Sequence, residues 1–410
     1  MSSLLIVESP AKCSKIQGFL GAGWRVIATM GHIRSLEEDL GAVGLDRDFE
    51  PRFQWIKEKS KAIAQIKEAA TKANTIYLAS DDDREGEAIS YSVLTLLKLN
   101  PATTPRAVFH EITESAVKAA VANPRRLDMN RVHAQQARAV LDMMVGFTIS
   151  PLLWKYVGPA LSAGRCQTPA LRLLVDQEKA IRAHTTSTVW KVKGAWATGV
   201  KAPPFEAVLT EELENEESAT NFLENIHEDS DAKVISAETR PTTEQPPKPL
   251  ITSTLQQEAS ATMSLQPKRT MQIAQRLYEA GHITYMRTDS AVLSEEAKVA
   301  AANWVRTAFG EEYLAATTAN NPPKKSKSQA TRKSEAKPQE ARPQEAHEPR
   351  DKSRSAPGPP AAQEAHEAIR PTHFELTELP ADDDWTAPDR KLYKMIWNRA
   401  ITLCTARFQG

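Results

Sequence analysis

Short apolar segments alternate with helical patterns in the N-terminal part of the chain, and this alternation restricts the fold more than any other feature. Ser3–Val7 and Asn74–Ala79 are almost continuously apolar, as strands buried on both faces of a parallel sheet are. Weaker strand patterns cover Trp24–Thr29 and Arg106–Glu111, with helical patterns between them. The sequence therefore predicts an α/β domain with a parallel sheet over about residues 1–122.

Carboxylates gather directly after the second buried segment. Asp81, Asp83 and Glu85 alternate at the C-terminal end of this predicted strand, where open α/β sheets place their ligands. Three converging carboxylates repel one another unless a hard cation neutralises them, and oxygen ligands suit Mg²⁺. The sequence indicates a magnesium site; the alternative is a solvated acidic turn that caps the next helix.

Two charged residues follow the first predicted strand of the same sheet. Glu8 closes that strand and could face the same cleft as the acidic cluster. Lys12 lies on the first turn of a predicted helix, where its charge opposes the helix dipole. This position is unfavourable for stability but suits an anion. For each residue the alternative is an ordinary surface charge.

Single histidines and arginines elsewhere add weaker candidates. His32 and His366 suit phosphate contact or proton transfer, although a lone histidine is more often structural. Arg138 and Arg165 lie in Gln-Gln-Ala-Arg and Ser-Ala-Gly-Arg contexts and could hold a nucleic-acid backbone. Their alternative is solvation on a helix or loop surface.

A tyrosine, an arginine and an aspartate alternate in the segment that follows Gly281. Ile283, Thr284 and Tyr285 favour an extended backbone, which would point Tyr285, Arg287 and Asp289 to the same side. A phenol is a poor nucleophile near neutral pH, but an adjacent arginine can stabilise both a phenolate and a phosphate. A half-buried edge strand is the alternative.

The composition changes several times beyond residue 122. Residues 127–183 are mainly helical in pattern, 186–240 contain short β-like runs between acidic stretches, and 241–249 contain four prolines and form a predicted linker. Residues 318–362 are rich in proline, lysine and arginine, and their few apolar residues predict a flexible insert. Gln-Glu-Ala-His-Glu occurs at 344 and again at 363. Only the second copy continues into a sequence typical of ordered structure. We therefore interpret the first copy as a repeat that does not belong to the functional motif.

Composition restricts the function classes only weakly. The 52 basic and 52 acidic residues give a formal net charge of zero, so a nucleic-acid surface must be a local patch. Cys13, Cys166 and Cys404 lie far apart, which supports neither a disulfide framework nor a zinc ribbon. No signal peptide is apparent, and no apolar run approaches the ~18–20 residues of a membrane span. We expect a soluble intracellular protein without membrane contact.

Eight motifs occur in the order found in type IA DNA topoisomerases, and the resemblance runs from residue 4 to about 400, excluding the insert. The motifs are Val7-Glu-Ser-Pro-Ala-Lys12, Gly31-His-Ile-Arg34, Asp81-x-Asp-x-Glu-Gly-Glu87, His133-Ala-Gln-Gln-Ala-Arg138, Leu161-Ser-Ala-Gly-Arg165, Ile251-Thr-Ser-Thr-Leu-Gln-Gln257, Tyr285-Met-Arg-Thr-Asp-Ser290 and Glu364-Ala-His-Glu-Ala-Ile-Arg-Pro-Thr372. Some features resemble bacterial topoisomerase I and others topoisomerase III, which leaves the subclass open.

The resemblance implies a multidomain α/β and α+β fold. Residues 1–122 would form a Toprim domain, with 31–60 able to pack on a helical DNA-binding domain at 123–185. Residues 186–250 and 375–410 would form part of a β-rich gate arch, and 251–374 a mainly helical domain that carries the tyrosine. Members of this family continue beyond the equivalent of Gly410, so the resemblance also implies an N-terminal portion.

The resemblance implies a function as well: Mg²⁺-dependent, ATP-independent cleavage of one DNA strand, strand passage and religation, which relaxes negative supercoils. Tyr285 would form a 5′-phosphotyrosine link to single-stranded DNA. The assigned roles are as follows: Lys12, Arg287 and His366 at the phosphate; Glu8 in proton transfer or with Asp81, Asp83 and Glu85 at Mg²⁺; and His32, Arg138, Arg165, Asp289 and Arg370 at the DNA.

Two other functions remain open on the sequence alone. A Toprim nuclease or primase-like enzyme would need no covalent intermediate, and a catalytically idle fragment would only bind single-stranded DNA. We expect a monomer that uses no ATP. In a bacterium it would be cytoplasmic and associated with the nucleoid.

Overall fold

The computed structural model describes seven parts of the chain, which are 3–197, 203–226, 233–238, 246–314, 367–381, 384–403 and residue 405. The predicted insert at 318–362 and His366 lie outside the described residues. The chain divides into two compact units: Met1–Met144 with Thr242–Gly410, and Val145–Pro241. The candidate chemistry of the sequence lies almost entirely in the first unit.

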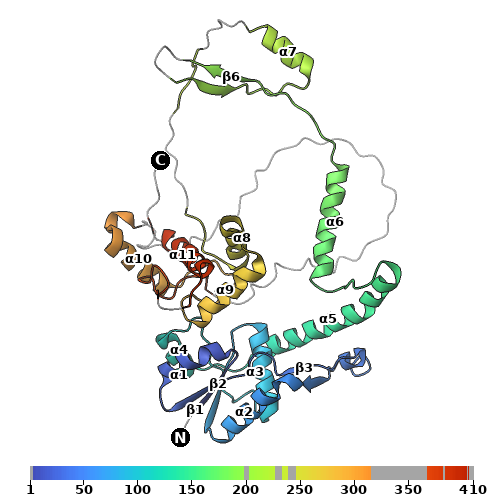
Figure 1. Cartoon of the computed structure of the whole chain (residues 1–410), viewed down its shortest axis with the longest axis vertical. Helices are drawn as coiled ribbons and strands as arrows, with labels where there is room; N and C mark the ends of the chain where they lie inside the picture. Colours follow the sequence, from blue (N-terminus) through green and yellow to red (C-terminus); the bar gives the residue numbers. More distant parts are fainter. Residues whose placement is uncertain are drawn as a thin grey trace, which may run out of the picture. The chain divides into compact units, whose positions relative to one another are not determined.

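The first unit contains a three-stranded parallel sheet in the order β2-β1-β5 (Figure 1). Its strands are β1 (Ser3–Val7), β2 (Trp24–Ala28) and β5 (Thr75–Ala79). Val7 pairs with Ala28 on one side and with Ala79 on the other. All three strands therefore end at the same edge, and Glu8 and the acidic loop that begins at Ser80 both leave the sheet there.

The strand predicted at Arg106–Glu111 is shorter than expected. Only Arg106 forms a parallel bridge, to Leu78, so the parallel sheet expected over 1–122 is confirmed with three strands rather than four. The chain leaves the sheet after Ala107, and the carbonyl oxygen of His110 accepts a hydrogen bond from the Tyr285 backbone N–H at 2.8 Å. His110 thus pairs with the tyrosine segment instead of extending the sheet.

Alternation along β1 divides the core into two layers. Leu5 and Val7 pack into one hydrophobic cluster, and Leu4 and Ile6 pack into the other, because successive side chains of a strand point to opposite faces. Helices α1 (Cys13–Leu20) and α4 (Glu114–Ala122) are among those that contribute to the first cluster, and α2 (Ser60–Thr71) and α3 (Arg84–Leu97) are among those that contribute to the second. The sheet is therefore covered by helices on both faces (Figure 1).

A second, antiparallel pair of strands lies beside α3. It consists of β3 (Arg34–Leu36) and β4 (Phe53–Trp55), with Arg34 opposite Trp55. The loop between them turns at Gly44, whose φ of 75° is left-handed and favours glycine. Residues 31–60 thus present an arginine and two aromatic side chains on a short ribbon.

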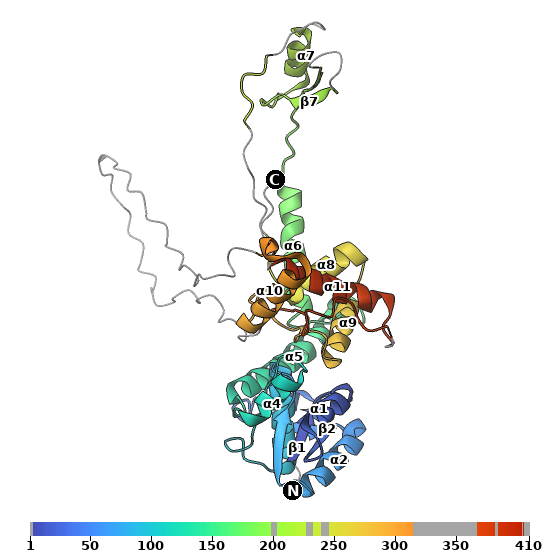
Figure 2. The same cartoon turned by 90° about the vertical axis from the view of Figure 1, so that its left-hand side faces the viewer.

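Four helices of the first unit form the body that carries the tyrosine. They are α8 (Thr252–Met263), α9 (Pro267–Glu279), α10 (Glu295–Phe309) and α11 (Ala387–Thr402). Gly281, with φ of 74°, follows the end of α9 as the sequence predicts. Both views show these helices grouped at one end of the sheet (Figures 1 and 2).

Helix α11 differs from the expected grouping of 375–410 with the gate arch. It packs on α8, α9 and α10. Leu392, Tyr393, Ile396 and Trp397 are buried in the same cluster as the tyrosine segment. The sequence marks this helix as amphipathic, but its apolar face alone does not identify the partner that buries it.

The second unit contains an antiparallel pair and two helices. Its elements are α6 (Gln167–Ala183), β6 (Lys193–Trp196), β7 (Phe205–Val208) and α7 (Glu216–Glu224). Helix α5 (Met129–Tyr156) runs across the boundary between the units. Both strands lie within the stretch 186–240, for which the sequence predicts short β-like runs.

One helix among the described residues is long and apolar enough to cross a membrane. It is α5, which has an 18-residue window of mean hydropathy 1.2 that is 6% buried. The sequence predicts no apolar run of this length. Length and composition are weak evidence of a span by themselves, and the first half of α5 carries residues of the candidate site.

Candidate active site

Tyr285 is held by backbone pairing on both sides of its segment. The Thr284 N–H donates to the carbonyl oxygen of Arg370 at 2.9 Å, and the Tyr285 N–H donates to that of His110. Apart from a bridge between Ile283 and Pro371, the segment is irregular rather than a strand. This pairing joins the tyrosine to the loop that leaves the sheet.

The hydroxyl of Tyr285 meets the acidic loop. It donates to Asp83 Oδ2 at 2.6 Å, and an Nη of Arg287 donates to the same oxygen at 3.2 Å. The expected alternation does not hold throughout, because Tyr285 is only 4% exposed whereas Arg287 and Asp289 are exposed. The tyrosine and the arginine nevertheless converge on one carboxylate that lies about 200 positions earlier in the chain.

Asp83 is held by its own helix as well. It caps the N-terminus of α3, and its Oδ1 accepts from the Gly86 N–H at 2.7 Å. A side chain at Gly86 would collide with the carbonyl oxygen of Asp81, so only glycine permits this close approach. The Gly-Glu pair of the acidic motif therefore fixes where Asp83 presents its second oxygen.

Lys12 and Asp81 form a buried ion pair beneath the tyrosine. Their side chains are 1% and 6% exposed. The hydroxyl of Tyr278 donates to the same Asp81 oxygen at 3.4 Å, and the Lys12 ammonium lies 4.7 Å from the centre of the Tyr278 ring. The Tyr278 ring also meets that of Tyr285 edge-on at 5.1 Å. A second tyrosine, which the sequence reading missed, thus packs between the lysine and the candidate nucleophile.

Glu85 turns away from the other two predicted metal ligands. Its Oε2 lies 2.9 Å from His32 Nε2 and accepts from the Gln135 side chain at 3.2 Å, while Arg138 approaches its other oxygen at 3.9 Å. The hydrogen bond from His32 is the main cause that holds the pKa of Glu85 below its usual range. His32 and Arg138, both predicted at DNA, therefore lie beside the acidic loop.

Two pKa shifts describe the electrostatics of the site. Burial raises the pKa of Glu8 to about 7, and the negative charges of Asp81 and Asp83 add to this effect. Burial, followed by Asp83 and Asp81, raises the pKa of Tyr285 well above its ordinary value. In this arrangement the phenol is neutral and donates its proton toward Asp83, and Glu8 exchanges a proton near neutral pH.

The donor set fits a hard cation in its chemistry. Glu8, Asp81 and Asp83 supply only carboxylate oxygens. Burial is the main cause of the raised pKa of Glu8, and the charges of Asp81 and Asp83 add to it against the opposing charges of Lys12 and Arg287. Nevertheless, the described residues contain no group of three His, Cys, Asp or Glu side chains arranged to hold a metal. Lys12 and Arg287 lie on two of the carboxylates that a cation would use.

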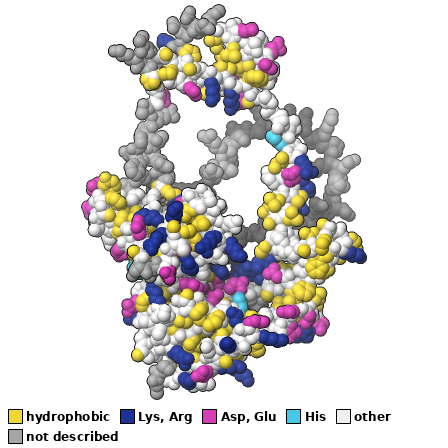
Figure 3. All heavy atoms as spheres, in the orientation of Figure 1, with side chains coloured by type: hydrophobic (Ala, Val, Ile, Leu, Met, Phe, Trp, Pro, Cys, Tyr) yellow, Lys and Arg dark blue, Asp and Glu magenta, His cyan; other side chains and the backbone are white. Residues whose placement is uncertain are grey.

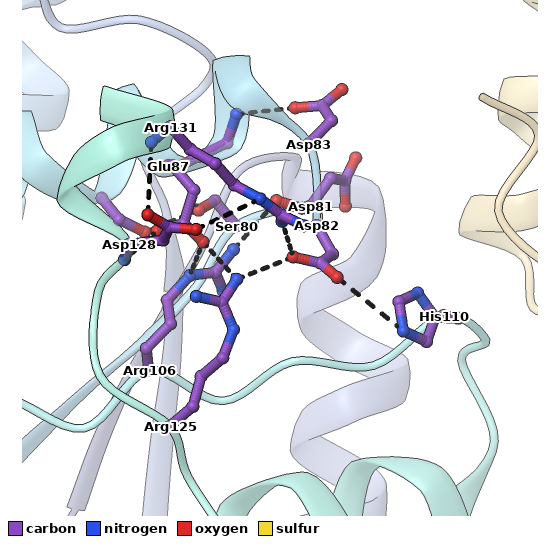
Figure 4. Close-up of polar contacts among 12 residues, drawn as sticks. Ser80, Asp81, Asp82, Asp83, Glu87, Arg106, His110, Arg125, Asp128 and Arg131 are labelled. Atoms are coloured by element: carbon purple, nitrogen blue, oxygen red, sulfur yellow. Dashed lines mark hydrogen bonds and ion pairs between the residues drawn. The ribbon is translucent and has the colours of Figure 1, made fainter. Parts of the chain in front are cut away.

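A buried network of arginines and acids supports the acidic loop from behind (Figure 4). The side chains of Arg106 and Glu87 are fully buried, with Arg106 Nε 3.1 Å from Glu87 Oε1. Arg106 also donates to the carbonyl oxygen of Asp81 at 2.9 Å. Arg125 bridges Glu87 and Asp82 at 2.5 and 2.7 Å. This network holds the backbone that presents Asp81 and Asp83.

Asp82 lies on the far side of the loop, as the alternation of the sequence predicts. Arg131 of α5 also contacts its Oδ1 at 2.7 Å. Burial opposes ionisation, but Arg125, Arg131 and His110 together hold the pKa of Asp82 below its usual range. Its charge therefore ties the start of α5 to the sheet.

This depressed pKa predicts an acid-labile junction. A carboxylate whose pKa is lower in the folded state stabilises the fold above its unfolded pKa, and this contribution is lost as the pH falls through the folded value. We expect hydrogen-exchange protection at the start of α5 to fall below about pH 4. In Asp82→Asn the protection should be lower at neutral pH and less dependent on pH; an unchanged profile would contradict this.

Three further predicted residues are Arg370, Arg165 and His366. Arg370, expected at the DNA, is 7% exposed and pairs with Glu367 at 2.6 Å and Glu111 at 3.0 Å. It joins the tyrosine segment to the loop after Ala107 instead of facing solvent. Arg165 is exposed in the second unit, and His366 lies outside the described residues. The side chain of Arg370 is thus used for packing beside the tyrosine segment.

An open cavity of about 500 Å³ adjoins the tyrosine. Its lining includes Asp83, Glu85, Arg138, Arg287 and Asp289. The surface view shows acidic side chains gathered where the α8–α11 body meets the sheet, with lysine and arginine side chains over that body (Figure 3). The lysine and arginine side chains suit the phosphates of a nucleic-acid strand.

The residues missed by sequence reasoning gave little local signal. Tyr278 belongs to the buried face of α9 with Thr270, Ile273, Ala274 and Leu277, and a buried aromatic at helical spacing is usually core. Arg106 begins a predicted strand that ends on another charged residue, Glu111, so its charge alone gave no distinct signal. The full burial of Arg106 is explained only by its ion pair with Glu87.

The chain is similar to known proteins in both its sequence and its fold. A family model described as DNA topoisomerase matches residues 126–349, and a model of the Toprim domain matches residues 3–112. Among solved structures, full-length topoisomerase I from Thermotoga maritima is similar at 33% sequence identity and a TM-score of 0.77. The match covers 99% of this chain and 61% of that one, so this chain spans about three fifths of the length of that relative.

Proposed function

This chain belongs to the type IA DNA topoisomerase family, and on that premise we propose that it cleaves and reseals one DNA strand through a covalent bond to Tyr285. The observation that supports this most is the hydrogen bond from the Tyr285 hydroxyl to Asp83, beside Arg287. The proposed reaction needs no ATP because the tyrosyl ester conserves the energy of the phosphodiester. Strand passage through the gap would relax negative supercoils.

The nucleophile is activated by the carboxylate it already contacts. The Tyr285 oxygen attacks phosphorus as its proton passes to Asp83, and the bond from phosphorus to the 3′-oxygen breaks. The products are a 5′-phosphotyrosine and a free 3′-hydroxyl. Arg287, whose Nη lies 3.2 Å from Asp83, is placed to contact the phosphate oxygens.

The leaving oxygen requires a proton, and Glu8 is suited to supply it. A pKa of about 7 leaves this carboxyl partly protonated at neutral pH, which is the range in which a general acid works in both directions. Lys12 stabilises the developing charge from its buried position beside Asp81. Religation reverses these transfers: the 3′-hydroxyl attacks, its proton returns to Glu8, and Tyr285 regains its proton from Asp83.

The Toprim domain is a metal-binding domain, and we propose that Asp81 and Asp83, together with Glu8 when it is deprotonated, would hold Mg²⁺. A bound Mg²⁺ supplies positive charge that aligns the two strand ends for resealing. Glu85 was expected in this set, but its pairing with His32 and Gln135 assigns it to positioning those residues. Single-stranded DNA is the proposed substrate, bound with the help of His32, Arg138 and Asp289.

Magnesium removal should separate cleavage from resealing. We expect the protein with Mg²⁺ to reseal a cleaved oligonucleotide when high salt is added, whereas with a chelator the covalent adduct should persist. The measurement is the fraction of label bound to protein after denaturation. Resealing that is equally complete in the chelator would contradict a role for the metal at this step.

The same experiment distinguishes the two alternative functions. A Toprim nuclease would release fragments without a protein adduct, and an idle binding fragment would shift the native oligonucleotide without cutting it. Nothing in the arrangement favours either alternative, because neither requires a tyrosine hydroxyl on the acidic loop.

A further inference from the structure

An arginine without an acidic partner lies close to the candidate active site. The guanidinium of Arg34, in β3, lies 4.5 Å from the centre of the Phe53 ring and 5.5 Å from that of Tyr91. Its Nε is buried without a hydrogen-bond partner, and no ion pair joins it to the part of the chain that the structure describes. A buried polar group in this condition is costly.

The electrostatics agree with the geometry. Burial lowers the pKa of Arg34, which means that the charged form is poorly solvated where it lies. An arginine remains protonated even so. The charge of Arg34 is therefore not balanced by an ion pair with any described carboxylate. This holds although the acidic loop that begins at Ser80 contains several carboxylates.

Arg34 lines a cavity of about 210 Å³ between the β3–β4 ribbon, α3 and α5. Besides Arg34, the polar groups that line it include His32, Ser35, Ser92, Gln135 and Gln136. Each of these side chains carries a hydrogen-bond donor, of which the Ser92 hydroxyl is already used for the carbonyl oxygen of Ala88 at 2.8 Å. No carboxylate of the described residues lines the cavity. The cavity beside the tyrosine differs, since Asp83, Glu85 and Asp289 line it. The smaller cavity thus has the donor set of an anion site.

Resting on the proposed function, we propose that this cavity binds one backbone phosphate of the cleaved DNA strand, away from the scissile phosphate. The rings of Phe53 and Tyr91 lie against the guanidinium, and a guanidinium edge matches phosphate bidentately. A full negative charge balances the cation, which a neutral base does not. His32 and Gln135 line this cavity and also contact Glu85, so they connect it to the acidic loop.

The test uses single-strand binding without cleavage. Anisotropy of a labelled oligonucleotide is measured at several salt concentrations for Tyr285→Phe and for the same protein with Arg34→Met. We expect an affinity about tenfold lower at low salt. The slope of log K against log salt should decrease in magnitude by about 0.7, as for one lost phosphate contact on a single strand. Arg52→Met is the matched control, because Arg52 lies on the same ribbon but is balanced by Glu37 and Asp39.

A second variant keeps the proposal testable if Arg34→Met does not fold. Gln136→Glu preserves the shape of the lining and places a carboxylate in the cavity, and we expect it to lower both affinity and slope. Unchanged slopes in folded variants would overturn the phosphate assignment, as would a loss confined to particular base sequences. Failure of the Tyr285→Phe parent to bind any strand would instead overturn the proposed function, and this assignment with it.

Discussion

Tyr285→Phe should abolish the covalent DNA adduct while leaving single-strand binding within a factor of a few. The change removes only the hydroxyl that donates to Asp83 at 2.6 Å and keeps the ring that packs against Tyr278. No other described group occupies the same position on the acidic loop. The amount of covalent adduct should therefore fall below the detection limit of a denaturing gel. The measurement is the label retained by the denatured protein.

Tyr278→Phe is the matched control for this result. Tyr278 is also buried and also donates to the acidic loop, but its contact with Asp81 is longer, at 3.4 Å, and Lys12 lies over its ring. We expect this variant to retain the adduct, with a stability change of about 1 kcal/mol or less. Loss of the adduct in Tyr278→Phe and its survival in Tyr285→Phe would reassign the nucleophile.

Arg106→Met should destabilise the sheet by about 3–5 kcal/mol, since it leaves the buried Glu87 without one of its partners. It also removes the hydrogen bond that holds the carbonyl oxygen of Asp81, so cleavage should fall as well. Because a chain with two units need not unfold in one step, hydrogen exchange of the β1 and β5 amides is the appropriate measurement.

Two further variants serve as controls for Arg106→Met. Arg172→Met removes an exposed helix pair with Asp176 and should cost less than about 0.5 kcal/mol. Adding Glu87→Gln to Arg106→Met should restore part of the lost stability, because the uncompensated buried charge is then gone. Equal protection of β1 and β5 in Arg106→Met and the parent would show that the network does not support the loop.

Periodicity predicted the sheet and its helices well, because strand and helix patterns are local properties. β1, β2 and β5 coincide with their predicted runs within one residue, and Gly281 ends the helix before the tyrosine. The strand at Arg106–Glu111 was wrong beyond its first residue, since the Tyr285 backbone competes for His110. The position of α11 was equally inaccessible, because an apolar helix face does not specify its partner.

The sequence predicted which residues belong to the candidate site better than it predicted how they are arranged. The motif order selected Tyr285, Asp83, Lys12 and Arg287, and the structure gathers them. The expected convergence of Asp81, Asp83 and Glu85 was not found, because Lys12, Tyr285 and His32 each take one carboxylate. Pairings between residues about 70 to 200 positions apart depend on how the elements pack, which local spacing does not encode.

The strand polarity of the adduct tests the central claim most directly. The protein is incubated with Mg²⁺ and one oligonucleotide labelled either at its 3′ end or at its 5′ end, then denatured and separated on a gel. A 5′-phosphotyrosine at Tyr285 predicts that the 3′ label stays with the protein and that the 5′ label appears on a shorter free fragment with a 3′-hydroxyl. Retention of the 5′ label, or cleavage with no label on the protein, would contradict the account.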